Sequence, residues 1–187
     1  MNNIFVVSGP SGSGKSTLIK MLREKYKDLE FSVSFTTRTK RETESDGRDY
    51  YFISEEKFLK MINEKKFAEW AKVHRNYYGT SFKDIEERSK NGKILILDID
   101  VQGAEIIKKK FPGSFLVFIK PPDIYELKKR LLTRDKKPDK NIEVRLNAAE
   151  NELGRSGFYD RTIINDKLED AFEKLESIFL FFKRSLN

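Results

Sequence analysis

A glycine-rich run near the start of the chain carries the clearest chemical signal in the sequence. Residues 9–16 read Gly-Pro-Ser-Gly-Ser-Gly-Lys-Ser and match the phosphate-loop pattern G-x-x-x-x-G-K-[ST] in full. In such a loop the backbone N–H groups turn inward around phosphate oxygens, and the following helix directs its N-terminus at the same anion. Lys15 is expected to reach the β- and γ-phosphates, and the Ser16 hydroxyl is expected to bind Mg²⁺. The pattern predicts a site for a nucleoside triphosphate but does not identify the reaction.

An acidic pair follows an apolar run in the middle of the chain. Residues 94–97 are Ile-Leu-Ile-Leu, and Asp98 and Asp100 come next to them. A carboxylate at the end of a buried strand lies at the carboxyl edge of a parallel sheet, where it could hold Mg²⁺, mostly through water. The alternative for both residues is an aspartate that caps the following helix. We expect Ser16, Asp98 and Asp100 to form the magnesium site.

Strands and helices alternate along most of the chain. Short β-rich runs separated by amphipathic segments predict a parallel sheet with helices on both faces, and therefore an α/β fold. The expected strands cover residues 3–7, 94–97, 115–119 and 162–164. The expected helices cover residues 15–26, 102–110, 142–153, a segment that begins at 124 after the capping residue Asp123, and a C-terminal stripe from Leu168 to Phe182.

Two segments interrupt this alternation. Residues 34–90 are polar and aromatic, and they contain a helix start at Ser54. We interpret them as a subdomain inserted into a single domain whose core consists of residues 1–33 and 91–187. Residues 133–141 carry many charges and a proline without periodicity, and we interpret them as part of a mobile lid.

Composition excludes several classes of protein. The chain has no Cys and one His, so disulfides are excluded and a Cys/His zinc site is effectively excluded. The net charge of +7 is compatible with nucleic acid, a membrane surface or small anionic substrates, but no base-stacking or zinc-finger motif supports nucleic acid. No targeting segment is visible and no run is apolar enough to span a bilayer. A soluble cytoplasmic protein, expected to be a monomer, is the simplest interpretation.

The inserted segment gathers residues that suit an anion. Two arginines lie close together at positions 38 and 41, and tyrosines and hydroxyl residues follow them. Arginine binds phosphate through two parallel hydrogen bonds, and tyrosine hydroxyls add neutral donors. One such residue would be an ordinary surface or core residue, but the collection predicts a phosphate pocket with one carboxylate, Glu69, beside it.

At this point the sequence strongly resembles the guanylate kinases, over essentially the whole chain. The motifs that carry the resemblance are the phosphate loop, residues 34–41, Asp49-Tyr50, Glu69-Trp70, residues 77–80, residues 97–103, Arg145-Leu146 and Asn165-Asp166. The resemblance implies a P-loop kinase core with a GMP-binding insertion and a lid. It also implies a Mg²⁺-dependent transfer of the γ-phosphoryl group of ATP to GMP, and to dGMP as a second acceptor.

The resemblance also implies the role of each site residue. The residues that would hold GMP are Ser34, Arg38, Arg41, Tyr50, Glu69, Tyr78, Thr80 and Asp98. Among these, Ser34, Glu69 and Thr80 would read the guanine. The residues that would hold ATP are Gly9, Pro10, Ser11, Gly12, Ser13, Gly14, Lys15, Ser16, Thr17 and, near the adenine, Asn165. The residues that would surround the transferring phosphoryl group are Lys15, Arg41, Arg134 and Arg145, with Arg130 assisting.

Two other functions compete with this interpretation. A non-catalytic module of guanylate-kinase type could bind protein partners, but such modules tend to lose loop and arginine residues that this chain retains. A kinase for a different nucleoside monophosphate is the second alternative. Glu69 and the Tyr-Tyr-Gly-Thr run at residues 77–80 favour guanine.

Overall fold

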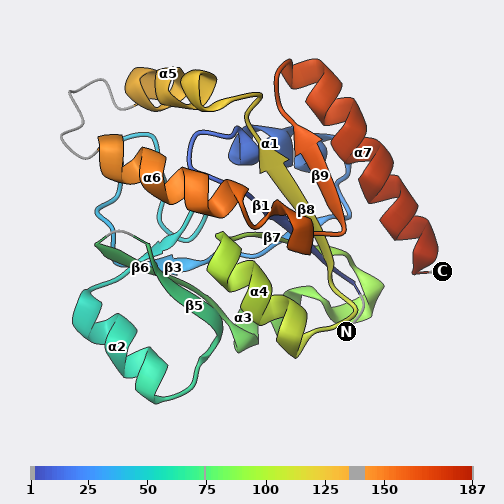
Figure 1. Cartoon of the computed structure of the whole chain (residues 1–187). Helices are drawn as coiled ribbons and strands as arrows, with labels where there is room; N and C mark the ends of the chain where they lie inside the picture. Colours follow the sequence, from blue (N-terminus) through green and yellow to red (C-terminus); the bar gives the residue numbers. More distant parts are fainter. Residues whose placement is uncertain (1–2, 74, 135–141, 187) are drawn as a thin grey trace. The chain divides into compact units, whose positions relative to one another are not determined.

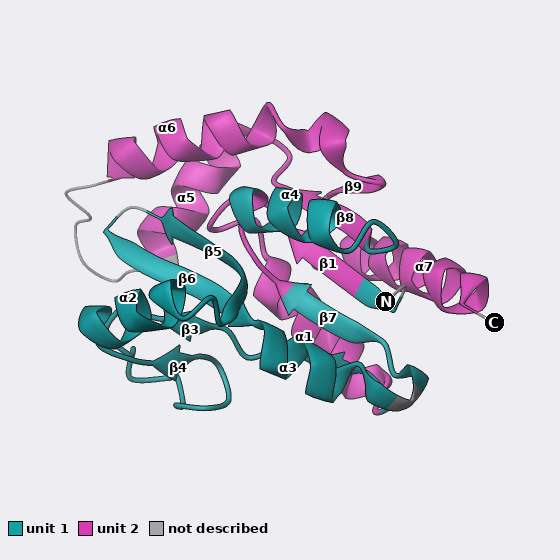
Figure 2. Ribbon diagram, turned by 90° about the horizontal axis from the view of Figure 1, so that it is seen from below, with its two compact units in different colours: residues 1–4, 28–97, 102–114 teal, residues 5–27, 98–101, 115–187 magenta. Residues whose placement is uncertain are grey.

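The computed structural model describes residues 3–73, 75–134 and 142–186, without the side chains of Asn91 and Arg134 (Figure 1). Most of the predicted lid therefore lies outside the described residues. Those residues divide into two compact units, coloured separately in Figure 2. Unit 1 comprises Met1–Ile4, Asp28–Leu97 and Gln102–Ser114, and unit 2 comprises Phe5–Lys27, Asp98–Val101 and Phe115–Asn187. Unit 1 contains all of the predicted insertion, residues 34–90.

Unit 2 is built on parallel strands covered by helices. Its strands are β1 (Ile4–Ser8, whose first residue belongs to unit 1), β8 (Phe115–Lys120) and β9 (Arg161–Ile164). β8 pairs in parallel with β1 on one side and with β9 on the other. The helices are α1 (Lys15–Lys25), α5 (Ile124–Arg134), α6 (Ile142–Leu153) and α7 (Leu168–Ser185), with the short 3-10 turn η2 (Ser156–Phe158) before β9. The predicted elements of this half are confirmed.

Aromatic side chains fill the core of unit 2. Phe5 is fully buried and meets Phe179 of α7 edge to face, with 5.8 Å between the ring centres. Continuous apolar runs such as residues 4–7 and 116–119 are buried throughout because a parallel strand between two helical layers meets core on both faces. α7 packs against α1 and β9, so the predicted C-terminal stripe is the face that closes this core.

Unit 1 contains a short parallel pair and a second sheet. β2 (Glu30–Phe31) pairs in parallel with β7 (Leu95–Asp98), which is followed by α4 (Val101–Lys110). The second sheet has the order β4-β3-β6-β5 and consists of β3 (Phe35–Thr36), β4 (Tyr51–Phe52), β5 (Phe67–Val73) and β6 (Asn76–Ser81). The remaining elements are α2 (Glu55–Asn63), α3 (Phe82–Arg88) and the 3-10 turn η1 (Lys90–Gly92).

The second sheet is a feature that the sequence pattern did not predict. It is held by a small aromatic cluster in which Phe58 of α2 stacks on Phe67 of β5 at 4.4 Å and on Tyr77 of β6 at 5.4 Å. Two of the strands are only two residues long, and a bulge between Phe67 and Glu69 breaks the alternation of the third. These interruptions hide the period of two by which strands are usually detected.

The two helix caps that the sequence predicts are confirmed. The Ser54 hydroxyl accepts the backbone N–H of Lys57 at 3.2 Å, and the Asp123 carboxylate accepts that of Glu126 at 2.8 Å. Each satisfies one of the N–H groups that a helix leaves unpaired at its start. No helix among the described residues is long and apolar enough to cross a membrane.

The aromatic cluster of unit 1 gives a stability prediction. Phe58→Ala should lower the free energy of unfolding by about 3–5 kcal/mol, because a fully buried ring leaves a cavity between α2 and the second sheet. The neighbouring residue Leu59 is 41% exposed, and Leu59→Ala should cost less than about 1 kcal/mol. Urea denaturation of both variants measures the difference, and equal losses would show that the cluster does not stabilise the unit.

Candidate active site

The phosphate loop depends on a glycine that has no room for a side chain. Gly9 has φ 137°, and a Cβ placed on it would lie 2.0 Å from the carbonyl oxygen of Ile119 in β8. Gly14 also has a left-handed backbone, φ 91°, and forms the N-cap of α1. The loop therefore rests directly on the backbone of β8 and turns into α1 within a few residues, which aims the start of the helix at the loop.

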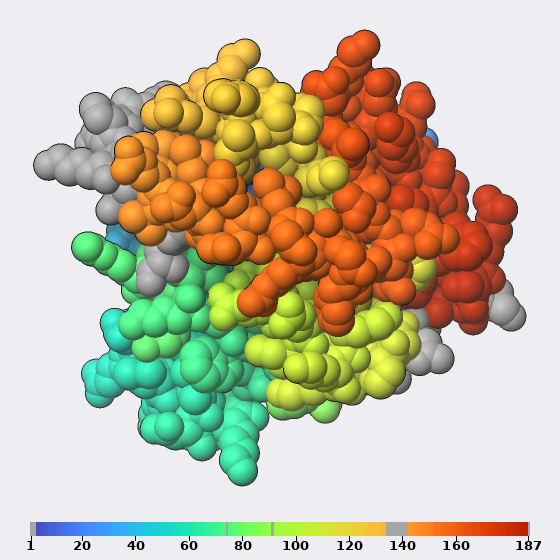
Figure 3. Space-filling view, in the orientation of Figure 1, coloured from blue at the N-terminus to red at the C-terminus, as the bar shows by residue number. Residues whose placement is uncertain are grey.

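Lys15 folds back over this loop. Its ammonium donates to the carbonyl oxygens of Gly9 at 2.6 Å and Pro10 at 3.2 Å. A second loop contact comes from Arg145 of α6, whose Nη2 donates to the Ser11 hydroxyl at 3.1 Å. Figure 3 shows α6 in orange at the surface beside α5 in yellow. Two cations from different elements therefore lie at the same loop, as a site for a polyphosphate requires.

Asn165, the residue after β9, holds the phosphate loop through a hydrogen bond. Its side chain is buried and its amide Nδ2 donates to the carbonyl oxygen of Ser13 at 2.7 Å. Its backbone N–H donates to the carbonyl oxygen of Lys120, the last residue of β8, at 2.8 Å. A Cβ on Gly14 would meet the Asn165 amide at 2.1 Å. The structure thus gives Asn165 a contact with the phosphate loop, while the contact with adenine that the resemblance implies stays a prediction.

A hydroxyl and a carboxylate meet at the start of α1. The Ser16 hydroxyl donates to Oδ2 of Asp98 at 3.0 Å. This pair of hard oxygen groups suits Mg²⁺, which proteins usually hold through one or two carboxylates together with substrate phosphates. No cluster of three or more Asp, Glu, His or Cys that could hold a metal on its own occurs among the described residues.

Glu152 is a charged neighbour that the sequence did not reveal. Burial, with a further contribution from Asp100, raises the pKa of Glu152 to about 7, although Lys15 and Arg155 act in the opposite direction. Glu152 lies seven residues after Arg145 on α6, which is two helical turns and therefore the same face. That spacing is the signal that could have identified it.

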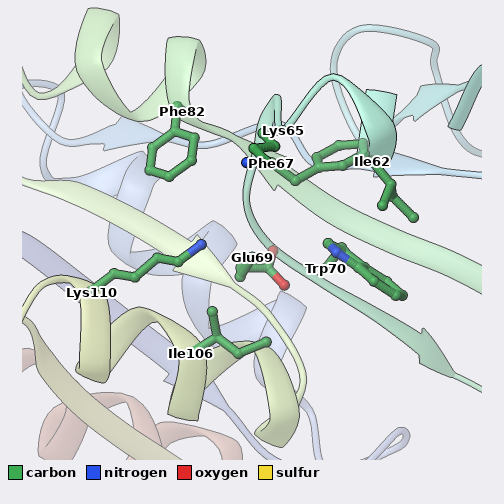
Figure 4. Close-up of a pocket in the computed structure, with 8 residues that line it drawn as sticks. All are labelled: Ile62, Lys65, Phe67, Glu69, Trp70, Phe82, Ile106 and Lys110. Atoms are coloured by element: carbon green, nitrogen blue, oxygen red, sulfur yellow. The ribbon is translucent and has the colours of Figure 1, made fainter. Parts of the chain in front are cut away.

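In unit 1, the residues expected to read guanine form a buried polar group. The hydroxyls of Ser34 and Thr80 share a hydrogen bond of 2.9 Å, and either can be the donor. Glu69 of β5 is paired in register with Thr80 of β6 and is only 3% exposed. Such burial excludes the ordinary interpretation of this glutamate as half of a surface ion pair. Its side chain lines a hollow of about 340 Å³ together with Trp70, Ile106 and Lys110. Figure 4 shows these side chains.

A second buried carboxylate, that of Asp84, makes hydrogen bonds with the segments next to Ser34 and Thr80. Asp84 of α3 accepts the Ser32 hydroxyl at 2.5 Å and the Val33 backbone N–H at 3.2 Å, and it pairs with Arg88 at 2.7 Å. Its own N–H donates to the Ser81 hydroxyl at 3.1 Å. Asp84 therefore joins the segment that leads to Ser34 with the strand that carries Thr80.

The residues expected to hold the acceptor phosphate lie on and beside one loop. We call residues 37–50, which connect β3 to β4, the acceptor loop. Arg38 lies over the ring of Tyr50 at 5.6 Å, and the Tyr50 ring meets that of Tyr78 at 5.9 Å. Arg41 lies 3.6 Å from Glu44, which the sequence did not single out. The structure thus brings Arg38, Tyr50 and Tyr78 together, and their role in holding the GMP phosphate stays a prediction.

Two predicted arginines of α5 have different outcomes. Arg134 is the last residue of α5, and its side chain lies outside the described residues. Arg130 pairs with Glu126 at 2.9 Å and reaches the carbonyl oxygen of Asp166 at 3.5 Å, so its described contacts are structural. Asp98, which the resemblance also assigns to GMP, belongs to unit 2, whereas the other expected GMP residues belong to unit 1.

A parallel sheet with a complete phosphate loop, its lysine and its serine–aspartate pair defines a P-loop nucleotide-binding protein. Comparison with known proteins gives the family. The guanylate kinase family model matches residues 1–180. The guanylate kinase of Geobacter sulfurreducens is 44% identical over 177 residues, which cover 95% of this chain and 87% of that protein. That of Campylobacter jejuni strain RM1221 is 46% identical, with coverages of 96% and 89%.

Solved structures agree. The crystal structure of guanylate kinase from Anaplasma phagocytophilum superposes with a TM-score of 0.78 at 30% sequence identity, and the match covers 96% of this chain and 85% of that one. The chain belongs to the guanylate kinase family.

The raised pKa of Glu152 gives a pH-dependent prediction for the nucleotide-free protein. Its folded pKa of about 7 lies above the ordinary 4.5, so stability from this group is fully present below 4.5 and is lost as the pH rises through 7. Glu152→Gln should therefore stabilise the protein by about 1–2 kcal/mol near pH 8.5 and change little near pH 4.5. Urea denaturation at both pH values tests this, with the exposed Glu150→Gln as control. Equal stability of wild type and Glu152→Gln at the higher pH would contradict it.

Proposed function

We propose that this protein is a working guanylate kinase that transfers the γ-phosphoryl group of ATP to GMP and gives ADP and GDP. The observation that carries the proposal is an intact phosphate loop in a chain of this family. Lys15 lies over the loop, Ser16 meets Asp98, and Arg145 reaches Ser11. A module that had lost catalysis would not need to retain this set.

The chemistry that the residues must supply is mainly positioning and charge neutralisation. Both substrates are anions and repel each other, and phosphoryl transfer needs little covalent participation by the protein. Lys15 and Arg145 supply positive charge at the donor loop, and Arg38 and Arg41 supply it at the acceptor loop. A GMP phosphate is itself a competent nucleophile near neutral pH. The reaction therefore needs no strong general base.

Magnesium belongs to the proposal as a cofactor. Ser16 and Asp98 would hold it together with phosphate oxygens of ATP, and Asp100 would contribute through water. When bound, the ion would supply further positive charge at the β- and γ-phosphates.

Base recognition is assigned to the buried group in unit 1. Guanine presents N1–H and an exocyclic amine as neighbouring donors, and the Glu69 carboxylate can accept both. Adenine presents an acceptor at N1, which a buried carboxylate would repel. The Ser34 and Thr80 hydroxyls can each donate or accept, so they can adapt to the remaining edge of the base.

Three finer statements complete the proposal. Residues 133–141 and the insertion at residues 34–90 would close over the bound substrates and exclude water, which would otherwise hydrolyse ATP. The protein would act as a monomer on small-molecule substrates, without nucleic acid or membrane. We place it in the cytoplasm, where free nucleotides are interconverted.

The test of the proposed function combines a panel of acceptors with Lys15→Ala. Wild-type protein with Mg-ATP should form ADP with GMP and dGMP far faster than with AMP, IMP or UMP, measured in a coupled assay. Lys15→Ala should lower kcat by about 10²–10³, roughly 3–4 kcal/mol, because a preorganised charge at the β- and γ-phosphates is lost. Exposed Lys20 on the same helix gives the control, Lys20→Ala. No ADP formation with GMP by folded wild-type protein would refute the function, and normal turnover by Lys15→Ala would refute the role of this lysine.

Glu69→Gln tests the reading of the base. One oxygen that accepts a guanine proton becomes an amide that donates, so catalytic efficiency with GMP should fall by roughly tenfold or more while the KM for ATP stays nearly unchanged. IMP lacks the exocyclic amine, so it should lose less than GMP does. Exposed Glu64→Gln serves as the matched control. Wild-type efficiency with GMP in Glu69→Gln would show that this residue does not read the base.

A further inference from the structure

The acceptor loop contains a carboxylate that the proposed reaction does not yet use. Glu44 faces Arg38 in a two-pronged pairing, with Nη1 to Oε2 at 3.0 Å and Nη2 to Oε1 at 2.7 Å. Both side chains are largely shielded, at 16% exposed for Arg38 and 13% for Glu44. Arginine is expected to grip a phosphate with this same edge of the guanidinium. The partner of that edge in this structure is an internal carboxylate.

Glu44 also holds the neighbourhood of the second arginine. Its Oε2 accepts the backbone N–H of Arg41 at 2.8 Å, and its Oε1 lies 3.6 Å from the Arg41 guanidinium. The backbone N–H of Glu44 donates back to the carbonyl oxygen of Arg41 at 3.1 Å. One side chain therefore joins the Arg38 guanidinium to the turn at residues 41–44.

The pKa shifts of Glu44 and Arg38 are consistent with an ion pair between them. Burial alone would raise the pKa of Glu44, but hydrogen bonds from Arg38 and from the Arg41 backbone more than offset it, so its pKa lies below the ordinary value. Burial would lower the pKa of Arg38, but Glu44 and the Tyr78 hydroxyl raise it overall. Both groups are therefore held in their charged forms.

The orientation of Arg38 is fixed by further contacts. Nη1 also donates to the carbonyl oxygen of Thr39 at 2.8 Å, and the guanidinium lies 5.6 Å from the ring centre of Tyr50 and 5.7 Å from that of Phe52. Both N–H groups of Nη1 and one of Nη2 are thus engaged, and the guanidinium also hydrogen-bonds the Tyr78 hydroxyl. A phosphate cannot take the Nη1–Nη2 edge while Glu44 remains there. We therefore expect a phosphate to meet Arg38 on the side of the Tyr78 hydroxyl, which already lies at this guanidinium.

Two roles for Glu44 can be distinguished. It could stand in for the phosphate and leave when GMP arrives, or it could stay and hold the arginines in place. Leaving would exchange two charge-assisted hydrogen bonds to Arg38 and one hydrogen bond from the Arg41 N–H for hydrogen bonds to water. Charge-assisted bonds of this two-pronged kind are the stronger ones, so the exchange is unfavourable. Staying keeps the loop intact and keeps both arginines in contact with the same carboxylate, which fixes where their positive charge lies.

We propose that Glu44 is a positioning residue for the acceptor phosphate, whose carboxylate fixes the Arg38 guanidinium and the turn that carries Arg41 in the arrangement that receives a nucleoside monophosphate. This inference rests on the proposed function, because it concerns the phosphate end of the same acceptor site. It adds a residue that need not touch the substrate.

Calorimetry with GMP and with guanosine separates the phosphate end of the site from the base end. In Glu44→Ala the affinity for GMP should fall by about tenfold or more, while the affinity for guanosine, which has no phosphate, should stay within about twofold of wild type. Glu44→Gln keeps the shape but loses the charge and should show an intermediate loss. Exposed Glu42 lies in the same loop, and Glu42→Gln is the matched control.

Kinetics give the second measurement. The KM for GMP should rise in proportion to the lost affinity, whereas kcat should fall by less than about threefold and the KM for ATP should stay within about twofold. An unchanged or tighter affinity of Glu44→Ala for GMP would overturn the proposal and favour the stand-in role. Equal losses for GMP and guanosine in both Glu44 variants would also overturn it, because they would indicate a general loosening of unit 1.

These outcomes can be told apart from failure of the proposed function. The binding measurements need no turnover, so they report on Glu44 even if the wild-type protein forms no ADP with GMP. If Glu44→Ala does not fold, as judged by circular dichroism, Glu44→Gln decides the question with the same two ligands.

Discussion

The phosphate loop of unit 2 depends on one close contact between two backbone segments, at Gly9 and Ile119. Gly9 lies so close to the carbonyl oxygen of Ile119 that no side chain fits between them. That contact seats the phosphate loop on β8, and the loop in turn sets the direction of α1, the position of Lys15 and the meeting of Ser16 with Asp98. Asn165, which directly follows β9, donates a hydrogen bond to the same loop. A single missing side chain is thus the constraint on which the other donor residues rely.

The residues expected to hold the acceptor follow a different physical rule, in which charges are held by shielded partners of opposite sign. Glu44 holds Arg38, and Asp84 pairs with Arg88 while it joins the segments that carry Ser34 and Thr80. A buried charge is expensive unless it is paired and hydrogen-bonded. These pairs therefore restrict each charged group to few orientations. Ordered charges are what a site for an anion needs, because the reorganisation is completed before the substrate arrives.

Much of unit 2 could be predicted from sequence, and the reasons are local. Its strands are continuous apolar runs, its helices carry clear stripes and caps, and the phosphate loop is a motif whose backbone requirements determine the residue types. The second sheet of unit 1 escaped prediction, because β3 and β4 are two residues long and the bulge before Glu69 breaks the alternation of β5. Its aromatic cluster becomes visible only when Phe58, Phe67 and Tyr77 are brought together in space.

In the site, too, some residues could be predicted from the sequence and others could not. The resemblance supplied the residues that would touch the substrates, but Glu44, Asp84 and Glu152 did not stand out, because glutamate and aspartate are common on any surface. Their importance comes from their partners in space, which for Asp84 include Arg88, four residues away along the chain, and Ser32, fifty-two residues away. Spacing along one element could have indicated Glu152, whereas contacts between segments could not have been read from the sequence.

The residues expected to bind the two substrates come from different stretches of the chain, because they belong to different units. Residues expected to grip ATP come from unit 2, and residues expected to grip the acceptor come, except for Asp98, from residues 34–80 of unit 1. A lineage could therefore explore substitutions in that stretch and change which monophosphate is accepted without altering a residue of the phosphate loop. The protein would keep ATP as its phosphate donor while the monophosphate that it accepts changed. In evolutionary terms, the residues expected to choose the base can vary apart from the phosphate loop, whereas Arg41, expected beside the transferring phosphoryl group, must be preserved with that loop.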